Sequence, residues 1–151
     1  LRDKPTHALS YGQKKRVAIA GVLVMEPEVL ILDEPTAGLD PQGVSDIMKL
    51  LTRLRDELGM TVLIATHDMD IVPLYCDYAY LLGSGKVLLE GTPEQLFADP
   101  AALRANHLRL PRIAHLMEVL RDVDGLDADR SAATIGAARR EILRMLKEEN
   151  Q

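Results

Sequence analysis

The 151 residues of this chain predict an α/β fold: a parallel strand–helix–strand unit, then a β-hairpin, then helices alone. Two short apolar runs, residues 29–32 and 61–66, flank a long stretch with helical periodicity. A strand, a helix and a strand in this order form a parallel pair joined by a right-handed crossover. From Thr92 onward only helical patterns occur, which predicts two domains, residues 1–98 and 99–151.

Capping residues mark the two helices expected in the first half. Ser10 is suited to cap a helix of about four turns that ends before Pro27. Asp40 stands before Pro41 as a cap stands before a first-turn proline, and Gly59 ends that helix. The two apolar runs beside this second helix are typical of strands buried on both faces. The apolar residues of the second helix recur at helical spacing: Val44, Ile47, Met48, Leu51, Leu54 and Leu58.

Turn residues indicate a hairpin in the second half. Strands are expected over residues 78–82 and 87–90, on either side of the sequence GSGK at residues 83–86. This tetrapeptide resembles the end of a phosphate-binding loop. Tyr80 and Val87, however, stand where such a loop needs Gly and Ser or Thr. We therefore interpret residues 83–86 as a turn.

Helical patterns surround this hairpin. A short helix is expected over residues 69–76, before the first strand. After the second strand, Thr92 begins a capping-box pattern, and Asp99 caps the helix that follows. An apolar face after Pro111 predicts a further helix. Ser131 is expected to cap the last one.

Composition excludes several classes of function. The net charge of -5 argues against a nucleic-acid-binding protein, which shows a basic face. The single cysteine, Cys76, forms no internal disulfide and suits a reducing cytoplasm, and it has no metal-ligand spacing with the histidines. The longest apolar stretch, residues 17–25, is shorter than the roughly 20 residues that cross a bilayer. No signal-peptide pattern opens the sequence. Because it begins without an initiator Met and a motif follows almost at once, we expect it to be part of a longer protein.

Two adjacent carboxylates follow the first predicted strand, at the end where α/β sheets bind ligands. Asp33 and Glu34 point to opposite sides, because successive strand residues alternate. Asp33 is therefore suited to bind Mg²⁺ through water, and Glu34 to orient or deprotonate a water aimed at a γ-phosphate. The alternative is a strand that simply leaves the sheet with two charged residues.

Four further residues are candidates for the same chemistry. Ser10 and Gly12 stand at a helix N-terminus, where free N–H groups and the helix dipole favour phosphate. The alternative, which the segment favours when it is taken alone, is an ordinary Ser-capped helix with a solvated basic face. His67 follows the second strand, where an imidazole can touch a phosphate and the attacking water, or can simply be a polar exit residue. For Asp40, the alternative is that it only caps a helix.

Four motifs, in order, resemble those of the ATP-binding-cassette (ABC) ATPases. LSYGQ at residues 9–13 is similar to the family signature LSGGQ, with Tyr11 in place of the first glycine. LILDEP at residues 30–35 resembles the Walker B motif. AGLDP at residues 37–41 resembles the D-loop, and ATHD at residues 65–68 resembles the switch-histidine loop.

Within this family, residues 13–41 and 91–117 are most similar to the ATPase of energy-coupling-factor importers, particularly the cobalt or nickel type. The resemblance implies a partial P-loop NTPase fold that lacks the Walker A strand. It also implies that the full-length protein is a transport ATPase whose two ATPase subunits pair head to tail around ATP.

The resemblance assigns the signature residues to the partner's nucleotide. Ser10, Gly12 and Gln13 are expected to contact the γ-phosphate of ATP bound by the partner chain, and Tyr11 is expected to leave this function intact. Asp40 is expected to couple the two ATP sites.

For the chain's own nucleotide, the resemblance implies that Asp33 serves Mg²⁺, Glu34 is the general base and His67 senses the γ-phosphate. The other partners it implies are a transmembrane coupling subunit and a substrate-binding membrane subunit, and the location it implies is peripheral, on the cytoplasmic face of the cell membrane. No nucleic acid is expected as a partner.

The phosphate loop and the glutamine loop of the family are expected upstream of Leu1. We therefore expect the 151 residues alone to be catalytically inactive. The strand ending at Thr66 lacks its expected neighbour, and a bare edge invites pairing with another chain. The chain is accordingly expected to dimerise, to swap elements or to rearrange its sheet.

Two other functions compete with the importer ATPase. One is a soluble family member that acts on DNA or ribosomes. Such proteins usually carry a coiled-coil insertion, a second cassette or basic surfaces, and none is visible in this sequence. The other is a non-catalytic fragment in which residues 99–151 form a dimerisation or regulatory module.

Overall fold

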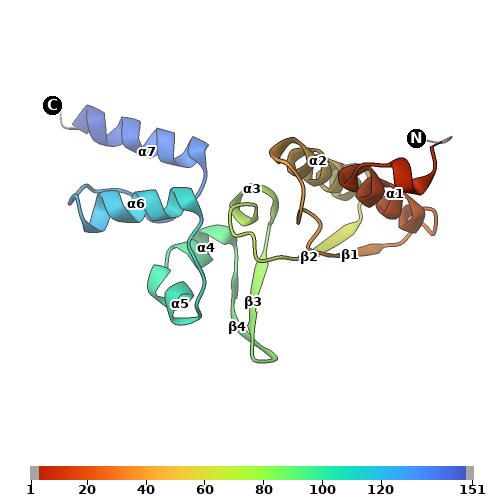
Figure 1. The fold of residues 1–151 in the computed structure, drawn as a ribbon. Helices are drawn as coiled ribbons and strands as arrows, with labels where there is room; N and C mark the ends of the chain where they lie inside the picture. Colours follow the sequence, from red (N-terminus) through yellow and green to blue (C-terminus); the bar gives the residue numbers. More distant parts are fainter. Residues whose placement is uncertain (1–3, 149–151) are drawn as a thin grey trace. The chain divides into compact units, whose positions relative to one another are not determined.

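The computed structural model describes residues 4–148 (Figure 1). Residues 1–3 and 149–151, the ends of the two predicted domains, lie outside the described residues. The chain divides into two compact units, which we call the first unit, Leu1–His67, and the second unit, Asp68–Gln151. No helix of the described part is long and apolar enough to cross a membrane.

The first unit is a parallel βαβ unit preceded by a helix. Strands β1 and β2 pair in parallel, from Val29 beside Thr61 to Asp33 beside Ala65. This pairing confirms the strand–helix–strand prediction. The elements are a 3-10 helix η1 (Thr6–Ala8), α1 (Tyr11–Leu23), β1 (Val29–Asp33), α2 (Pro41–Leu58) and β2 (Thr61–Ala65).

The predicted caps of both helices are present. Ser10 caps α1 in a reciprocal capping box with Gln13. Asp40 caps α2 by accepting the N–H of Gly43 at 2.6 Å. Gly59 ends α2 in the left-handed conformation, with φ 66°, which suits a residue without Cβ.

The strand pair is covered on one face. Leu30 is 3% exposed, whereas the next residue, Ile31, is 72% exposed. Leu63, the partner of Ile31 across the pair, is also exposed. The prediction of strands buried on both faces is therefore wrong for the described residues, because α1 and α2 lie on the same side of the pair (Figure 1).

The second unit contains the predicted hairpin. Strands β3 (Ala79–Gly83) and β4 (Lys86–Gly91) pair antiparallel. Ser84 and Gly85, between them, have φ 49° and 72°, as the two central residues of a type I′ turn require. The interpretation of residues 83–86 as a turn is thus confirmed.

Two apolar clusters hold the second unit together, and α6 contributes to both. The remaining elements are α3 (Val72–Tyr75), α4 (Pro93–Phe97), α5 (Pro100–Ala105), α6 (Arg112–Asp122) and α7 (Ile135–Glu148). The hairpin cluster consists of Val72, Phe97, Leu103, Ala114 and Ala133, against which Leu81 and Leu89 of the strands pack. The tail cluster consists of Met117, Ala128, Ala132, Ala138 and Met145.

Residues from both sides of the predicted boundary at 98/99 share the hairpin cluster. The hairpin and the helices before residue 98 therefore pack with the helices after it, as one unit. The division into domains 1–98 and 99–151 stays a prediction.

The last helix begins later than the sequence suggested. It starts at Ile135, and the Thr134 hydroxyl accepts the N–H of Ala137 at 3.2 Å. The Ser131 hydroxyl instead donates to the Asp129 carboxylate at 2.8 Å, and the Ser131 N–H donates to the same group. The prediction that Ser131 caps this helix is wrong, because a nearby aspartate captures both of its donors in a local turn. The helix expected over residues 69–76 is also shorter, since α3 spans only Val72–Tyr75.

Candidate functional site

Glu34 occupies an unusual backbone position directly after β1. Its φ is 46°, in the left-handed region that residues with a side chain seldom adopt. Its N–H donates to the carbonyl of Ala65, the last residue of β2, at 2.9 Å. The sheet thus fixes the Glu34 backbone while the chain turns away from β1.

The segment after β2 holds the Glu34 carboxylate. Oε1 accepts the backbone N–H of His67 at 3.0 Å and lies 2.6 Å from His67 Nδ1. Oε2 accepts the Thr66 hydroxyl at 3.3 Å. The hydrogen bond from the His67 side chain is the largest cause that holds the pKa of Glu34 below its ordinary value. The carboxylate is therefore ionised at neutral pH and oriented by groups of a neighbouring loop.

Both side chains remain within reach of a ligand. The side chain of Glu34 is 33% exposed and that of His67 is 85% exposed. An ionised carboxylate only accepts hydrogen bonds, so the proton between the two side chains belongs to His67 Nδ1. The pair has the geometry of a general base with an orienting imidazole.

Asp33 precedes this pair at the end of β1, and its side chain is exposed. It forms no hydrogen bond or ion pair with the described residues. A single carboxylate suits Mg²⁺, which keeps several waters and takes further oxygens from substrate phosphates. Residues 4–148 contain no group of three or more His, Cys, Asp and Glu that could hold a metal on their own. The donor set fits a magnesium ion that a nucleotide helps to bind.

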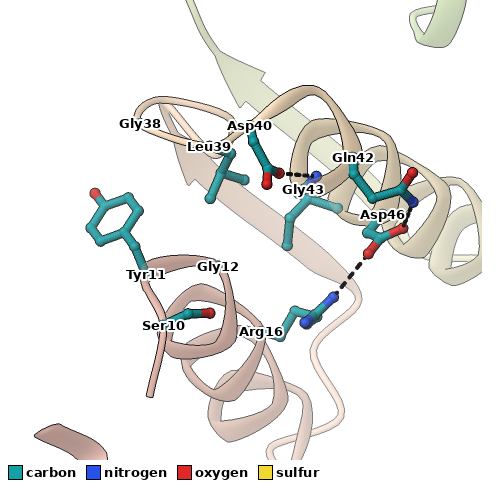
Figure 2. Close-up of a pocket in the computed structure, with 11 residues that line it drawn as sticks. Ser10, Tyr11, Gly12, Arg16, Gly38, Leu39, Asp40, Gln42, Gly43 and Asp46 are labelled. Carbon is teal, nitrogen blue, oxygen red and sulfur yellow. Dashed lines mark hydrogen bonds and ion pairs between the residues drawn. The ribbon is translucent and has the colours of Figure 1, made fainter. Parts of the chain in front are cut away.

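Three other predicted residues line one pocket of about 430 Å³ between the N-termini of α1 and α2 (Figure 2). Its wall is polar where Arg16 pairs with Asp46 at 3.2 Å and Gln42 donates to Asp46 at 2.8 Å. The predicted residues in the pocket are Ser10, Gly12 and Asp40, and Tyr11, Gly38, Leu39, Gly43 and Ile47 complete the lining.

The residues at this pocket already cap helices. The Ser10 hydroxyl accepts the N–H of Gln13 at 3.3 Å, and the Gln13 side chain accepts the N–H of Ser10 at 3.0 Å. Asp40 accepts the N–H of Gly43. Gln13 is not among the lining residues, since its side chain turns back to the Ser10 backbone. The structure thus supports the cap interpretation and also exposes Ser10 and Asp40 to a cavity.

Lys15 is a residue whose importance sequence reasoning missed. Its ammonium donates to the carbonyls of Glu34, Pro35 and Ala37 at 2.9, 2.8 and 2.9 Å. Burial lowers the pKa of Lys15, and the Glu34 carboxylate opposes that shift. The signal available in the sequence was its i, i+4 spacing from Tyr11, whose ring centroid lies 5.2 Å from the ammonium.

The predicted site residues therefore form two groups in the first unit. Glu34 and His67 contact each other directly, and Ser10, Gly12 and Asp40 share the pocket. Lys15 joins α1 to the loop that contains Glu34. Among the described residues, no hydrogen bond or ion pair joins the Asp33 side chain to either group.

Comparison with protein-family models matches residues 1–37 to the family described as "ABC transporter". The chain is 63% identical over 142 residues to the energy-coupling factor transporter ATP-binding protein EcfA3 of Clostridium perfringens, covering 94% of this chain and 50% of that protein. It is 55% identical over 148 residues to the corresponding protein EcfA of Methanocaldococcus jannaschii, covering 98% of this chain and 52% of that protein. The chain spans about half the length of the curated relatives it matches.

Solved structures show the same likeness. The chain resembles cbiO1 from Clostridium perfringens, described as part of the ABC transporter complex cbiONQ, with a TM-score of 0.63 and 68% identity over 78% of this chain and 47% of that chain. A second neighbour is an ATP-binding cassette described as a dimer in a post-hydrolysis state bound to ADP and Pi. Its TM-score is 0.51, with 37% identity over 57% of this chain and 37% of that chain.

Proposed function

Because the chain belongs to the ABC transporter ATPases and matches those of the energy-coupling-factor type, we propose that it is part of the ATP-hydrolysing subunit of an importer. In this proposal the full-length protein couples ATP binding and hydrolysis to solute uptake, and the solute is a cobalt or nickel ion.

The hydrogen-bonded pair of Glu34 and His67 carries the proposal. Glu34 accepts the proton of the water that attacks the γ-phosphate, and His67 orients Glu34 and contacts the transferred phosphate. A carboxylate held ionised by its neighbours is ready to act as a base at neutral pH.

The pocket between α1 and α2 serves the other nucleotide site. In this proposal Ser10 and Gly12 bind the γ-phosphate of ATP held by a second ATPase subunit, Gln13 braces Ser10, and Asp40 couples the two sites. The Ser10 hydroxyl accepts from Gln13, so its own proton remains available to donate to a phosphate oxygen. The N-terminal N–H groups of α1 add favourable interactions with an anion.

The ligands of this proposal are ATP and Mg²⁺, with Asp33 contacting the ion through water. The proposed partners are a second ATPase subunit, a transmembrane coupling subunit and a substrate-binding membrane subunit. The subunit is accordingly placed at the cytoplasmic face of the membrane, as a peripheral protein.

The test uses the full-length protein assembled with its partner subunits. Glu34→Gln should lower the rate of ATP hydrolysis by about 10²- to 10⁴-fold, the usual contribution of a general base, while ATP binding persists. The control is Glu28→Gln, which removes an exposed carboxylate of the same type and should leave the rate unchanged. Full activity in Glu34→Gln would contradict the assigned role.

Uptake of radioactive cobalt and nickel by cells that express the complete transporter tests the solute. Uptake of either ion that depends on Glu34 would support cobalt or nickel as the substrate. Glu34-dependent hydrolysis without uptake of either ion would overturn the choice of substrate alone.

A further inference from the structure

Lys15 makes an unusually complete set of contacts for a lysine. An ammonium has three N–H donors, and here each has a backbone carbonyl within 2.9 Å, from Glu34, Pro35 and Ala37. Withdrawing an ammonium from water is costly unless its hydrogen bonds are replaced. The loop after β1 replaces them, so the lysine and the loop stabilise each other.

The three acceptors belong to the segment that sets the position of Glu34. Residue 34 is in the left-handed conformation, and the N–H of Ala37 donates to the Glu34 carbonyl at 3.2 Å. The same Glu34 carbonyl also accepts from Lys15. Removing the ammonium would leave a strained turn with three carbonyls that lose a common donor.

Tyr11 reinforces this connection from the same face of α1. Its ring lies near the Lys15 ammonium. It also lies against Gly38, where an added Cβ would be 3.2 Å from Tyr11 Cε1. Figure 2 shows the Tyr11 ring directed from α1 towards the loop that contains Gly38. Tyr11 and Lys15, which lie one helical turn apart on α1, thus both contact this loop.

We propose that Lys15 is a positioning residue that fixes Glu34 for hydrolysis by tying the loop of residues 34–37 to α1. Since Ser10 caps the same helix, Lys15 also connects the pocket at Ser10 to the Glu34–His67 pair. The inference rests on the proposed function, because it assigns Lys15 a role in the reaction for which Glu34 is the base.

Lys15→Met in the full-length, assembled protein tests the inference, since methionine keeps an unbranched side chain, one heavy atom shorter, and removes the donors. The expected result is a fall in kcat of about ten- to hundredfold, as small misplacements of a reacting group cause. The KM for ATP should stay within about twofold, because Lys15 does not line the pocket.

Lys14→Met is the matched control. Lys14 is the exposed neighbour, and its side chain forms no hydrogen bond or ion pair with the described residues. Lys15→Arg, which keeps the charge and several donors, should recover most of the lost kcat. Lys15→Gln, which keeps two donors, should fall between Lys15→Arg and Lys15→Met, so the test does not depend on one variant folding.

Hydrogen exchange separates positioning from a general loss of stability. Peptides that cover residues 33–40 should exchange faster in Lys15→Met than in Lys14→Met, while those from β2 remain protected. A kcat of Lys15→Met equal to that of Lys14→Met would overturn the inference, and so would a rise in KM alone. If the unmodified assembly hydrolyses no ATP in a Glu34-dependent manner, the proposed function fails instead, which is a distinguishable result.

Discussion

The two units of the molecule fix a glutamate in opposite ways. In the first unit, the Glu34 side chain is 33% exposed and is held by the segment after β2. In the second unit, the Glu118 side chain is only 9% exposed and is held by Arg104 and His115. The Glu34 carboxylate is oriented yet remains accessible to a ligand, whereas the Glu118 carboxylate is buried against its partners. A hydrogen-bonded carboxylate therefore indicates a functional site only when it also stays accessible.

The largest difference in stability between the two units is expected from Phe97→Ala. Phe97 is fully buried in the hairpin cluster, and its truncation should lower the stability of the second unit by about 3–5 kcal/mol. Chemical denaturation followed by circular dichroism measures the loss, and hydrogen exchange should show protection of β1 and β2 unchanged. Tyr80→Ala, at an exposed position on β3, is the control and should cost much less. Equal losses in both variants would contradict the location of the core.

Glu118→Gln should weaken the second unit by about 1–3 kcal/mol, because Glu118 accepts charge-assisted hydrogen bonds in a nearly dry position. The bond from Arg104 is the largest cause that lowers the pKa of Glu118. A lowered folded-state pKa gives stability that is complete above the unfolded value of about 4.3. That stability is lost as the pH falls through the folded value.

The difference in stability between the unsubstituted chain and Glu118→Gln should therefore be constant at neutral pH and shrink below about pH 4. Denaturation at a series of pH values measures it. Glu90→Gln, at an exposed position on β4, supplies the control, for which little difference is expected at any pH. A difference that grew on acidification would have the wrong sign for this mechanism.

Gly38→Ala and Gly59→Ala together isolate the contact with Tyr11. Both glycines have positive φ, 72° and 66°, so each alanine should cost about 1–2 kcal/mol from the backbone alone. An added Cβ at Gly59 meets nothing within 4 Å, whereas at Gly38 it presses on the Tyr11 ring. Gly38→Ala should therefore be the more destabilising change in denaturant unfolding, and equal costs would argue that Tyr11 moves aside freely.

The smallest effect is expected from two equivalent caps, one in each unit. Ser10 and Thr92 both form reciprocal capping boxes, with Gln13 and Gln95. Replacing either by alanine should cost about 1 kcal/mol of stability. Only Ser10→Ala should also lower ATP hydrolysis by the full-length assembly, because only Ser10 lines the pocket of the first unit. A loss of hydrolysis in Thr92→Ala at equal stability would break the comparison.

Local signals in the sequence predicted much of the fold. The caps at Ser10 and Asp40 and the turn at Gly85 depend on residues a few positions apart, and the structure confirms them. Ser131 shows the limit of this approach, because a competing aspartate two residues earlier decided its partner. Exposure of Ile31 on one strand face was also missed, since it depends on which side the helices cover.

Parts of the site were also predictable from local signals in the sequence. Glu34 and His67 were identified separately, each at the end of an apolar run, and parallel pairing of those runs brings them together. The inward turn of Lys15 was not predictable from charge, because Lys14 and Arg16 beside it offer the same charge pattern. The bond between Arg104 and Glu118 joins α5 to α6 through two residues that lie 14 positions apart, and no local pattern marks it.

The left-handed backbone of Glu34 has a consequence for selection experiments. Glycine and asparagine adopt that conformation at lower cost than glutamate. A library randomised at residue 34 and sorted for stability alone should therefore drift to those two residues. The same library, placed in the full-length protein and sorted for the proposed transport, should return to glutamate, so residue 34 would record which of the two properties had been selected.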